Sequence, residues 1–228
     1  YESGEYGWAN QNGESIHAEK TTSFDIGYET YINSLDLNFN ITYFDILVED
    51  PIMGSNTTDG QDNVPGAENK SKGIELSTNW TDKKKLKIGF NYTLTKSYSG
   101  VDCDKPEKDK WGYTSCMDTG HGWLESAMVR VPIHALSSKI SYQFKKNWDN
   151  SLLMTYKGRT RDYGGTDYSF KDQILDEYFL VDLKSSYKLY DNYNLDFSVK
   201  NLFDKNYENS LDYSGTPRTM NIGLKFAY

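Results

Sequence analysis

The sequence predicts an all-β protein, an antiparallel segment of a transmembrane β-barrel, on three observations. Apolar and polar residues alternate along most of the 228 residues, the alternating stretches are long, and the connections between them are short and long in turn. Alternation with a period of two is typical of a strand with one apolar and one polar face. No stretch approaches the roughly 20 consecutive apolar residues that a membrane-spanning helix needs.

The alternation predicts nine strands. In one of them Leu37, Phe39 and Ile41 are separated by Asn38 and Asn40. The predicted strands cover residues 22–32, 35–47, 69–80, 85–98, 131–145, 149–159, 175–190, 192–203 and 217–228. Each exceeds the roughly 5–6 residues of a typical globular strand and reaches the roughly 9–11 residues that a tilted strand needs to cross a membrane. The lengths therefore favour a membrane barrel over a soluble sandwich.

The connections alternate in length. Short ones lie at 33–34, 81–84, 146–148 and 191, and long ones at 49–68, 99–130, 160–174 and 204–216. Transmembrane barrels have tight periplasmic turns and long extracellular loops. With the C-terminus placed in the periplasm, every long connection falls outside the cell and every short one inside.

The strand count also predicts that residues 1–228 are part of a larger barrel. Bacterial single-chain barrels have an even number of strands and leave no strand edge open to lipid. Nine is odd, and residues 1–21 fall on the extracellular side. We therefore expect the remaining strands to lie upstream.

Composition is consistent with this fold. The net charge of −8 makes a nucleic-acid partner a poor expectation. Aromatic residues make up 15%, with 19 tyrosines, as strands and membrane interfaces favour. The mean hydropathy of −0.75 is compatible with a barrel, whose strands turn one face to a polar lumen.

Two cysteines, Cys103 and Cys116, lie in the longest connection. A close pair in a chain with no other cysteine fits a disulfide formed in an oxidising compartment. Such a link would contribute about 3 kcal/mol in the chain-entropy model. The alternative is a pair of free thiols.

Six stretches, in order along the chain, resemble the C-terminal barrel of TonB-dependent receptors. Asn63–Leu76 is similar to the family segment N-x-x-x-A-x-x-x-G-x-E-L, and Asn201–Tyr207 to the ending N-L-F-D-x-x-Y. The other four are Ala18–Glu29, Leu37–Ile46, Arg130–His134 and Gly215–Tyr228. Ala18 stands where the family usually has Pro, and Thr216-Pro217 where it has Pro-Gly.

The resemblance implies a barrel of about 22 strands around a plug, of which residues 1–228 would be the C-terminal part without plug or TonB box. It implies an outer-membrane receptor, not an enzyme, that imports a scarce nutrient such as a ferric siderophore or cobalamin-like ligand. Its partners would be outer-membrane lipid, TonB, the barrel assembly machinery and the ligand, with no cofactor, and we expect a monomer. Leu224, Phe226 and terminal Tyr228 resemble the signal that the assembly machinery reads.

Candidate ligand contacts lie in two long connections. Trp111, Tyr113, His121 and Trp123 could stack on a ligand, although a connection packed on itself would explain them equally well. Arg159 and Arg161 could bind an anionic chelate, and ordinary surface charge is the alternative. The sequence shows no catalytic or metal-binding pattern.

Two other functional classes are compatible with a barrel. A barrel hydrolase would need an acid, a histidine and a nucleophile on adjacent strands, and His134 is the one histidine expected at a strand end. A porin or adhesin would carry no plug upstream.

Overall fold

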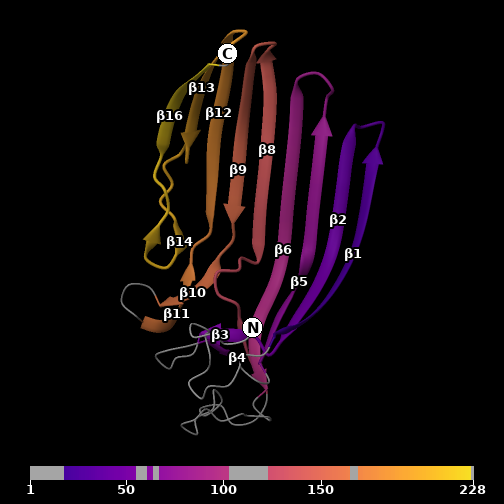
Figure 1. The fold of residues 1–228 in the computed structure, drawn as a ribbon, viewed down its shortest axis with the longest axis vertical. Coiled ribbons are helices and arrows are strands. Elements are labelled where there is room, and N and C mark those ends of the chain that lie inside the picture. Colours follow the sequence, from indigo (N-terminus) through magenta and orange to yellow (C-terminus); the bar gives the residue numbers. More distant parts are fainter. Residues whose placement is uncertain (1–17, 55–60, 64–66, 103–122, 165–168, 227–228) are drawn as a thin grey trace, which may run out of the picture. The chain divides into compact units, whose positions relative to one another are not determined.

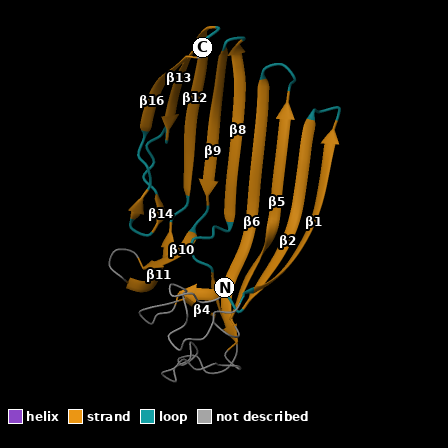
Figure 2. Ribbon diagram, in the orientation of Figure 1, coloured by secondary structure: helices purple, strands orange, loops and turns teal. Residues whose placement is uncertain are grey.

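The computed structural model describes residues 18–54, 61–63, 67–102, 123–164 and 169–226. All regular secondary structure in these residues is β-strand (Figure 2). Within them, no helix is long and apolar enough to span a membrane.

Nine long strands form one antiparallel sheet (Figure 1). They are β1 (Lys20–Ile32), β2 (Leu37–Glu49), β5 (Ala67–Thr81), β6 (Leu86–Asp102), β8 (His134–Lys145), β9 (Trp148–Lys157), β12 (Tyr178–Tyr190), β13 (Tyr193–Lys200) and β16 (Thr219–Phe226). They are neighbours in the sheet in the order β1-β2-β5-β6-β8-β9-β12-β13-β16. The prediction of nine consecutive long strands is confirmed, with most boundaries shifted by a few residues.

The chain divides into two compact units. The larger comprises residues 26–43, 73–95 and 129–228. In it, the four tight turns β1–β2, β5–β6, β8–β9 and β12–β13 gather at one end of the sheet, and β10, β11 and β14 lie at the other end (Figure 1). We call these the turn end and the loop end.

The smaller unit comprises residues 1–25, 44–72 and 96–128. In it β3 (Ile52–Gly54) pairs with β4 (Gln61–Asn63). β7 (Trp123–Ala127) pairs with the last residues of β6, Tyr98–Asp102. Two of the long connections thus begin or end in regular strand structure.

Two further hairpins differ from the prediction, which treated 160–174 and 204–216 as connections. β10 (Thr160–Gly164) pairs with β11 (Ser169–Leu175), and β14 (Glu208–Ser210) pairs with β15 (Tyr213–Ser214). These strands are too short to give a clear alternation in the sequence. Side-chain hydrogen bonds at the loop end hold them in place.

Strand register gives the sheet two chemically distinct faces. Leu183 pairs with Leu152 on one side and Val199 on the other, whereas the next residue, Lys184, pairs with Ser151 and Ser198. The same alternation continues from β13 to β16. One face is therefore apolar and the other polar, as the sequence predicts.

The apolar face is not buried in a protein core. Among the described residues, the buried aliphatic side chains of Leu and Val are those of Leu175, Val181, Val199 and Leu211. By contrast, Ile222 is 76% and Leu224 64% exposed, and many other large apolar side chains are exposed. An exposed apolar surface of this extent indicates an interaction with an apolar partner or a membrane.

Polar side chains shape the tight turns. The Asp82 carboxylate accepts the backbone N–H groups of Lys84, Lys85 and Leu86 at 2.8–2.9 Å. These bonds, led by that from Leu86, lower the pKa of Asp82. Asp36 adopts a φ of 49°, and its carboxylate binds Lys83 at 2.5 Å, which links the turns β1–β2 and β5–β6.

Candidate functional site

A buried carboxylate joins three segments at the loop end. Asp162 in β10 is 1% exposed, and its two carboxylate oxygens accept Arg130 Nε–H at 3.0 and 3.1 Å. One of them also accepts the backbone N–H of Leu211 at 2.9 Å. The Arg130 backbone N–H donates to the carbonyl of Arg161 at 2.8 Å. Asp162 therefore fixes the entry to β8, hairpin β10–β11 and the β14–β15 segment relative to one another.

Asn201 holds the connection between β13 and β16. It is 4% exposed and has a φ of 49°. Its Nδ2 donates to the carbonyls of Lys205 and Thr216, at 2.9 and 3.1 Å, and its Oδ1 accepts the Lys205 N–H at 2.9 Å. Asn tolerates the left-handed backbone and can also cap a turn. This explains physically the Asn that opens the stretch Asn201–Tyr207.

With these segments fixed, a cluster forms at the loop end of the polar face. Lys157 and Tyr178 pair across β9 and β12. The Tyr178 hydroxyl donates to Asn209 Oδ1 at 3.0 Å, and Lys157 Nζ lies 3.4 Å from the Asn209 carbonyl. The Tyr178 and Tyr207 rings lie 4.6 Å apart. We call Lys157, Tyr178, Tyr207 and Asn209 the loop-end cluster.

The cluster combines properties that suit ligand capture. Tyr178 and Tyr207 are half-buried and offer ring surface together with hydroxyl groups, and Lys157 supplies a positive charge. Tyrosines contribute large contact area with little conformational entropy to lose. The arrangement can stack on a planar group and attract an anionic one, and it contains no nucleophile with an adjacent base.

Gly215 makes room for Tyr207. Its backbone N–H donates to the Tyr207 carbonyl at 2.7 Å. A Cβ added at Gly215 would collide with the Tyr207 ring. The position of this ring therefore depends on a glycine at 215.

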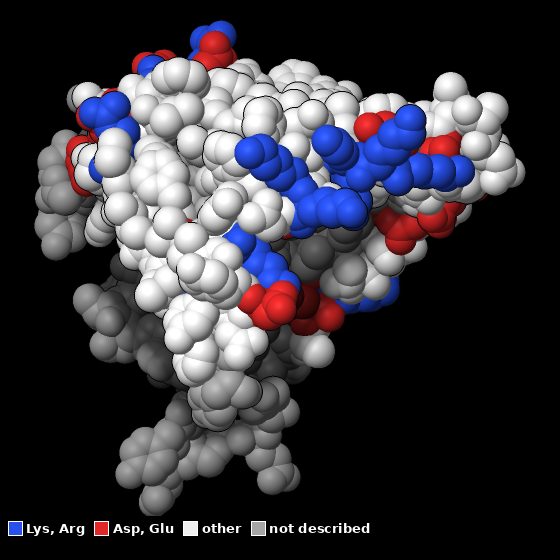
Figure 3. Space-filling view, turned by 90° about the horizontal axis from the view of Figure 1, so that it is seen from above, with Lys and Arg blue, Asp and Glu red and all other residues white. Residues whose placement is uncertain are grey.

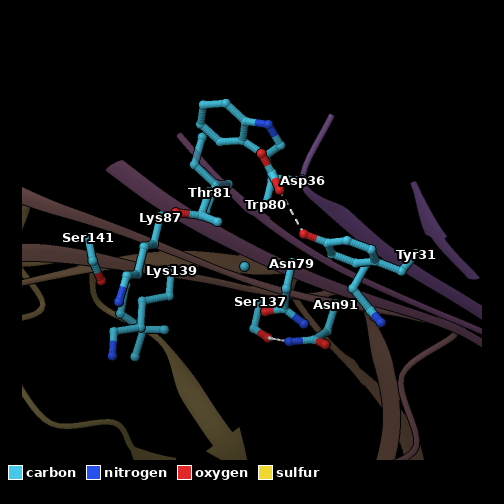
Figure 4. Close-up of a pocket in the computed structure, with 14 residues that line it drawn as sticks. Tyr31, Asp36, Asn79, Trp80, Thr81, Lys87, Asn91, Ser137, Lys139 and Ser141 are labelled. Carbon is cyan, nitrogen blue, oxygen red and sulfur yellow. Dashed lines mark hydrogen bonds between the residues drawn. The ribbon is translucent and has the colours of Figure 1, made fainter. Parts of the chain in front are cut away.

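Two hollows lie along the polar face. The larger, of about 690 Å³, includes Asn38, Asn79, Lys87, Asn91, Ser137 and Lys139 in its lining. Lys87, Lys139 and Ser141 lie on the same side of this hollow (Figure 4). The second, of about 520 Å³, is lined by Lys139, Asp182, Lys184 and Asp196 among others. Neither hollow includes a ligand contact that the sequence predicts.

The structure describes only some of the predicted ligand residues. Trp111, Tyr113 and His121 lie outside the described residues, as do Cys103, Cys116 and Tyr228. Trp123 is the first residue of β7, and its side chain is not described. Leu224 and Phe226 lie on the apolar face of β16, paired with Leu195 and Tyr193.

The two predicted arginines have different surroundings. Arg159 is 67% exposed and forms an ion pair with Glu177 at 3.5 Å. Glu177 also accepts the Tyr156 hydroxyl at 3.4 Å. The backbone carbonyl of Arg161 accepts the Arg130 N–H beside Asp162. The neighbouring Glu177 reduces the attraction of Arg159 for an anionic ligand.

The loop-end cluster itself was not predicted from the sequence. Two features of the sequence could have indicated it. One is the Tyr of the ending N-L-F-D-x-x-Y, here Tyr207, and the other is the position of Lys157 and Tyr178 on the polar side of their strands. Pairing these two strands in register would have brought Lys157 and Tyr178 together.

Among the described residues, no group of three or more His, Cys, Asp or Glu side chains could hold a metal ion. His134 is the first residue of β8, and its Nδ1 lies 2.8 Å from the Tyr92 hydroxyl oxygen. Its contact is with a tyrosine rather than with a catalytic acid.

Known proteins resemble this chain in both sequence and fold. Residues 3–202 match the family described as TonB dependent receptor-like, beta-barrel. The vitamin B12 transporter BtuB of Vibrio cholerae is 27% identical over 192 residues, which cover 83% of this chain and 27% of the transporter. The metal-pseudopaline receptor CntO of Pseudomonas aeruginosa is 23% identical over 97% of this chain and 30% of the receptor.

Solved structures share the fold. The siderophore receptor PiuA of Acinetobacter baumannii matches 96% of this chain and 30% of its own, at a TM-score of 0.72 and 20% identity. The ferripyoverdine receptor of Pseudomonas aeruginosa matches 96% of this chain and 28% of its own, at a TM-score of 0.68 and 18% identity. The chain thus spans less than a third of the length of these relatives. By the family match over residues 3–202, the chain belongs to the TonB-dependent receptor β-barrel family.

Proposed function

We propose that this chain forms part of the wall of an outer-membrane receptor that takes up a metal chelate of the siderophore or cobalamin class with energy from TonB. The observation that carries the proposal is the two-faced sheet of nine long strands with the loop-end cluster on its polar face. The apolar face meets lipid, and the polar face lines the lumen.

The orientation follows from the unequal ends of the sheet. The tight turns lie on the periplasmic side and the hairpins of the loop end lie outside the cell. The loop-end cluster is then accessible to ligands from the medium. Family membership supports this ligand class, as do relatives named as a vitamin B12 transporter, a metal-pseudopaline receptor and a siderophore receptor.

The rest of the barrel and a plug complete the receptor. β1 and β16 are the two ends of the strand order, and an open strand edge is unfavourable in lipid. We propose that further strands of the same protein pair with both, that a plug faces the hollows of the polar face, and that the barrel functions as a monomer. The apolar register of Leu224 and Phe226 in β16 supports recognition of the strand by the assembly machinery.

The ligand binds first at the extracellular loops. Tyr178 and Tyr207 stack on the chelate, and Lys157 attracts its negative charge. TonB then displaces the plug and the ligand passes along the polar wall. No bond of the ligand is broken, so the protein acts as a transporter and not as an enzyme.

Uptake by living cells tests the function. The complete gene is deleted, and uptake of radiolabelled ferric chelates and cobalamin is compared among the deletion strain, the complemented strain and a complemented strain that lacks TonB. We expect uptake of one chelate to require both the protein and TonB. Uptake that requires the protein but not TonB would instead indicate a passive porin. Unchanged uptake of every tested substrate in the deletion strain would reject a transport function.

The ligand contacts are tested in the same strains. We expect the Tyr178→Ala variant to raise the half-saturation concentration for uptake of that chelate roughly fivefold, because a stacked ring contributes about 1 kcal/mol. Tyr213→Ala removes an exposed tyrosine of the neighbouring strand β15 and is the matched control. Equal effects of the two variants would exclude the loop-end cluster as the binding site.

A further inference from the structure

A patch of lysines covers two neighbouring turns at the turn end. Lys84 and Lys85 lie in the turn between β5 and β6, and Lys145 and Lys146 at the turn between β8 and β9. All four residues are exposed. We call them the rim patch. Figure 3, which looks down on this end, shows basic side chains gathered close together.

Backbone hydrogen bonds bring the two turns together. The Gln143 N–H donates to the Lys85 carbonyl at 2.9 Å, so Lys85 lies beside the end of β8. Lys145 follows two residues later and pairs with Trp148 across the β8–β9 turn. The four positive charges are therefore held on adjacent segments of one rigid sheet.

Nearby carboxylates have hydrogen-bond or ion-pair partners of their own, and Asp82 in addition attracts the charge of Lys84, which helps to lower the pKa of Asp82. Asp82 accepts three backbone N–H groups of its own turn, and Asp36 binds Lys83. Asp149 accepts Gln143 Nε2 at 3.0 Å, and Asp191 binds Lys188 at 2.9 Å. Within the part of the chain that the structure describes, the rim patch has no ion-pair partner. This positive patch stands out in a chain whose net charge is −8.

An aromatic belt lies on the apolar face beside the rim patch. The rings of Tyr142, Phe144, Trp148 and Tyr187 contact one another in series, at centroid distances of 6.3, 5.2 and 6.1 Å. Trp148 Nε1–H donates to Ser185 Oγ at 2.8 Å. Such belts mark the level of the lipid headgroups. The belt therefore places the rim patch at headgroup height.

From this juxtaposition we infer that the rim patch binds the headgroups of anionic phospholipids in the periplasmic leaflet of the outer membrane. Lysines adjacent to a membrane surface attract anionic lipid, and several together select for it. The acyl chains lie against the apolar face, and the aromatic rings contact the glycerol region. Bound lipid thus covers the rim between two turns. The inference rests on the membrane location proposed above but not on ligand uptake.

Trp148 gives a local readout of lipid contact. The complete protein is reconstituted in phosphatidylcholine vesicles that contain a fraction of either brominated phosphatidylglycerol or brominated phosphatidylcholine, because bromine quenches a nearby indole. The fluorescence of Trp148 is obtained by subtracting the emission of the Trp148→Phe variant from that of the wild-type protein. We expect brominated phosphatidylglycerol to quench this signal at a lower mole fraction than brominated phosphatidylcholine does.

Substitution assigns the selectivity to the rim patch. K145A/K146A is expected to weaken the apparent affinity for phosphatidylglycerol about 30-fold, as about 1 kcal/mol for each lysine implies. K72A/K96A removes the same charge from two exposed strand positions of β5 and β6 and should leave the selectivity unchanged. Chelate uptake by each variant, measured separately, tests the transport proposal.

Three results would overturn the inference. Equal quenching by the two lipids would show that the rim does not select anionic headgroups. Selectivity retained in K145A/K146A would place the lipid elsewhere. Loss of selectivity on addition of inorganic phosphate, but not of an equal ionic strength of chloride, would assign the patch to free phosphate.

Discussion

Asp162 is the most deeply buried charged residue that the structure describes, and three segments meet at its carboxylate. A carboxylate removed from water costs free energy unless hydrogen bonds compensate it. Arg130 Nε–H and the Leu211 N–H provide this compensation. At the loop end, where apolar packing is limited to residues such as Leu175 and Leu211, a polar contact determines the geometry.

The first prediction concerns this contact. Asp162→Asn removes the negative charge that faces Arg130 and should lower the free energy of unfolding by about 2 kcal/mol, the usual scale for hydrogen bonds to a charged group. Denaturant unfolding of the complete protein in lipid vesicles measures the change. Asp176→Asn, at an exposed position between β11 and β12, is the control. If both variants unfold like the wild type, the Asp162 contact does not stabilise the loop end.

The second prediction concerns Gly215. Alanine there would place a Cβ against the Tyr207 ring, so the ring must shift and its contact with Tyr178 must change. We expect a loss of about 1–3 kcal/mol in unfolding free energy, the usual cost of overpacking. A Cβ at Gly223 would meet no atom within 4 Å, so Gly223→Ala should be tolerated. Equal stability of the two variants would contradict the described position of Tyr207.

The third prediction is a pH dependence of the β5–β6 turn. Backbone N–H groups, that of Leu86 first, lower the pKa of Asp82 below its ordinary 3.8. A depressed pKa in the folded state means that Asp82 stabilises the turn above the ordinary pKa and loses this contribution as the pH falls through the folded value. Hydrogen exchange of the Leu86 amide should therefore accelerate at that acidic pH. Asp82→Asn should remove the transition, and an unchanged transition in this variant would assign it to another group.

At the scale of elements, the long strands have one apolar and one polar face, which our proposal assigns to lipid and to the lumen. Met154 in β9 pairs with Ser138 and Val181, and the adjacent Thr155 pairs with Ser137 and Leu180 on the opposite face. Neighbouring residues of the same strand therefore meet different surroundings. A single pair of substitutions can distinguish a membrane barrel from a soluble sheet.

The fourth prediction uses this pair. Met154→Arg should destabilise the barrel in vesicles by about 2 kcal/mol or more, because it places a charge against hydrocarbon. Thr155→Arg introduces the same side chain one residue away on the polar face and should cost much less. The free energies of unfolding in vesicles provide the comparison. A larger cost for Thr155→Arg would reverse our assignment of the two faces.

The long strands were predictable because their signal is local. The alternation of Leu37, Phe39 and Ile41 identifies β2 without knowledge of any partner. The β10–β11 hairpin has no such pattern, and it depends on the contact of Asp162 with Leu211, 49 residues further along the chain. A contact of that separation leaves no periodic trace in the sequence.

The candidate site was harder to predict for the same reason. Lys157 and Tyr178 are 21 residues apart and meet because β9 and β12 pair in one particular register. The connection between them contains a hairpin, so its length does not fix that register. Arg159 was predicted as a ligand contact from its charge alone, and the sequence did not reveal that Glu177 is its partner.

At the scale of the whole molecule, the described residues bury few apolar side chains and expose an extensive apolar face. Such a surface is stable when hydrocarbon rather than water covers it. In our proposal, the loop-end cluster, the polar face and the rim patch occupy three levels of one wall: the outer surface, the lumen and the inner headgroups. The central claim is therefore that the chain crosses the outer membrane.

Labelling of single cysteines in cells tests this claim most directly. Cys103 and Cys116 are replaced by serine, and one cysteine is introduced at exposed Tyr213 of the loop end or at Asp191 of the turn end, whose side chain is 99% exposed. A thiol reagent that cannot cross the outer membrane should label Tyr213→Cys in intact cells, and Asp191→Cys only after the membrane is permeabilised. Labelling of both positions in intact cells, or protection of Tyr213→Cys there, would contradict a chain that spans the outer membrane with its loop end outside.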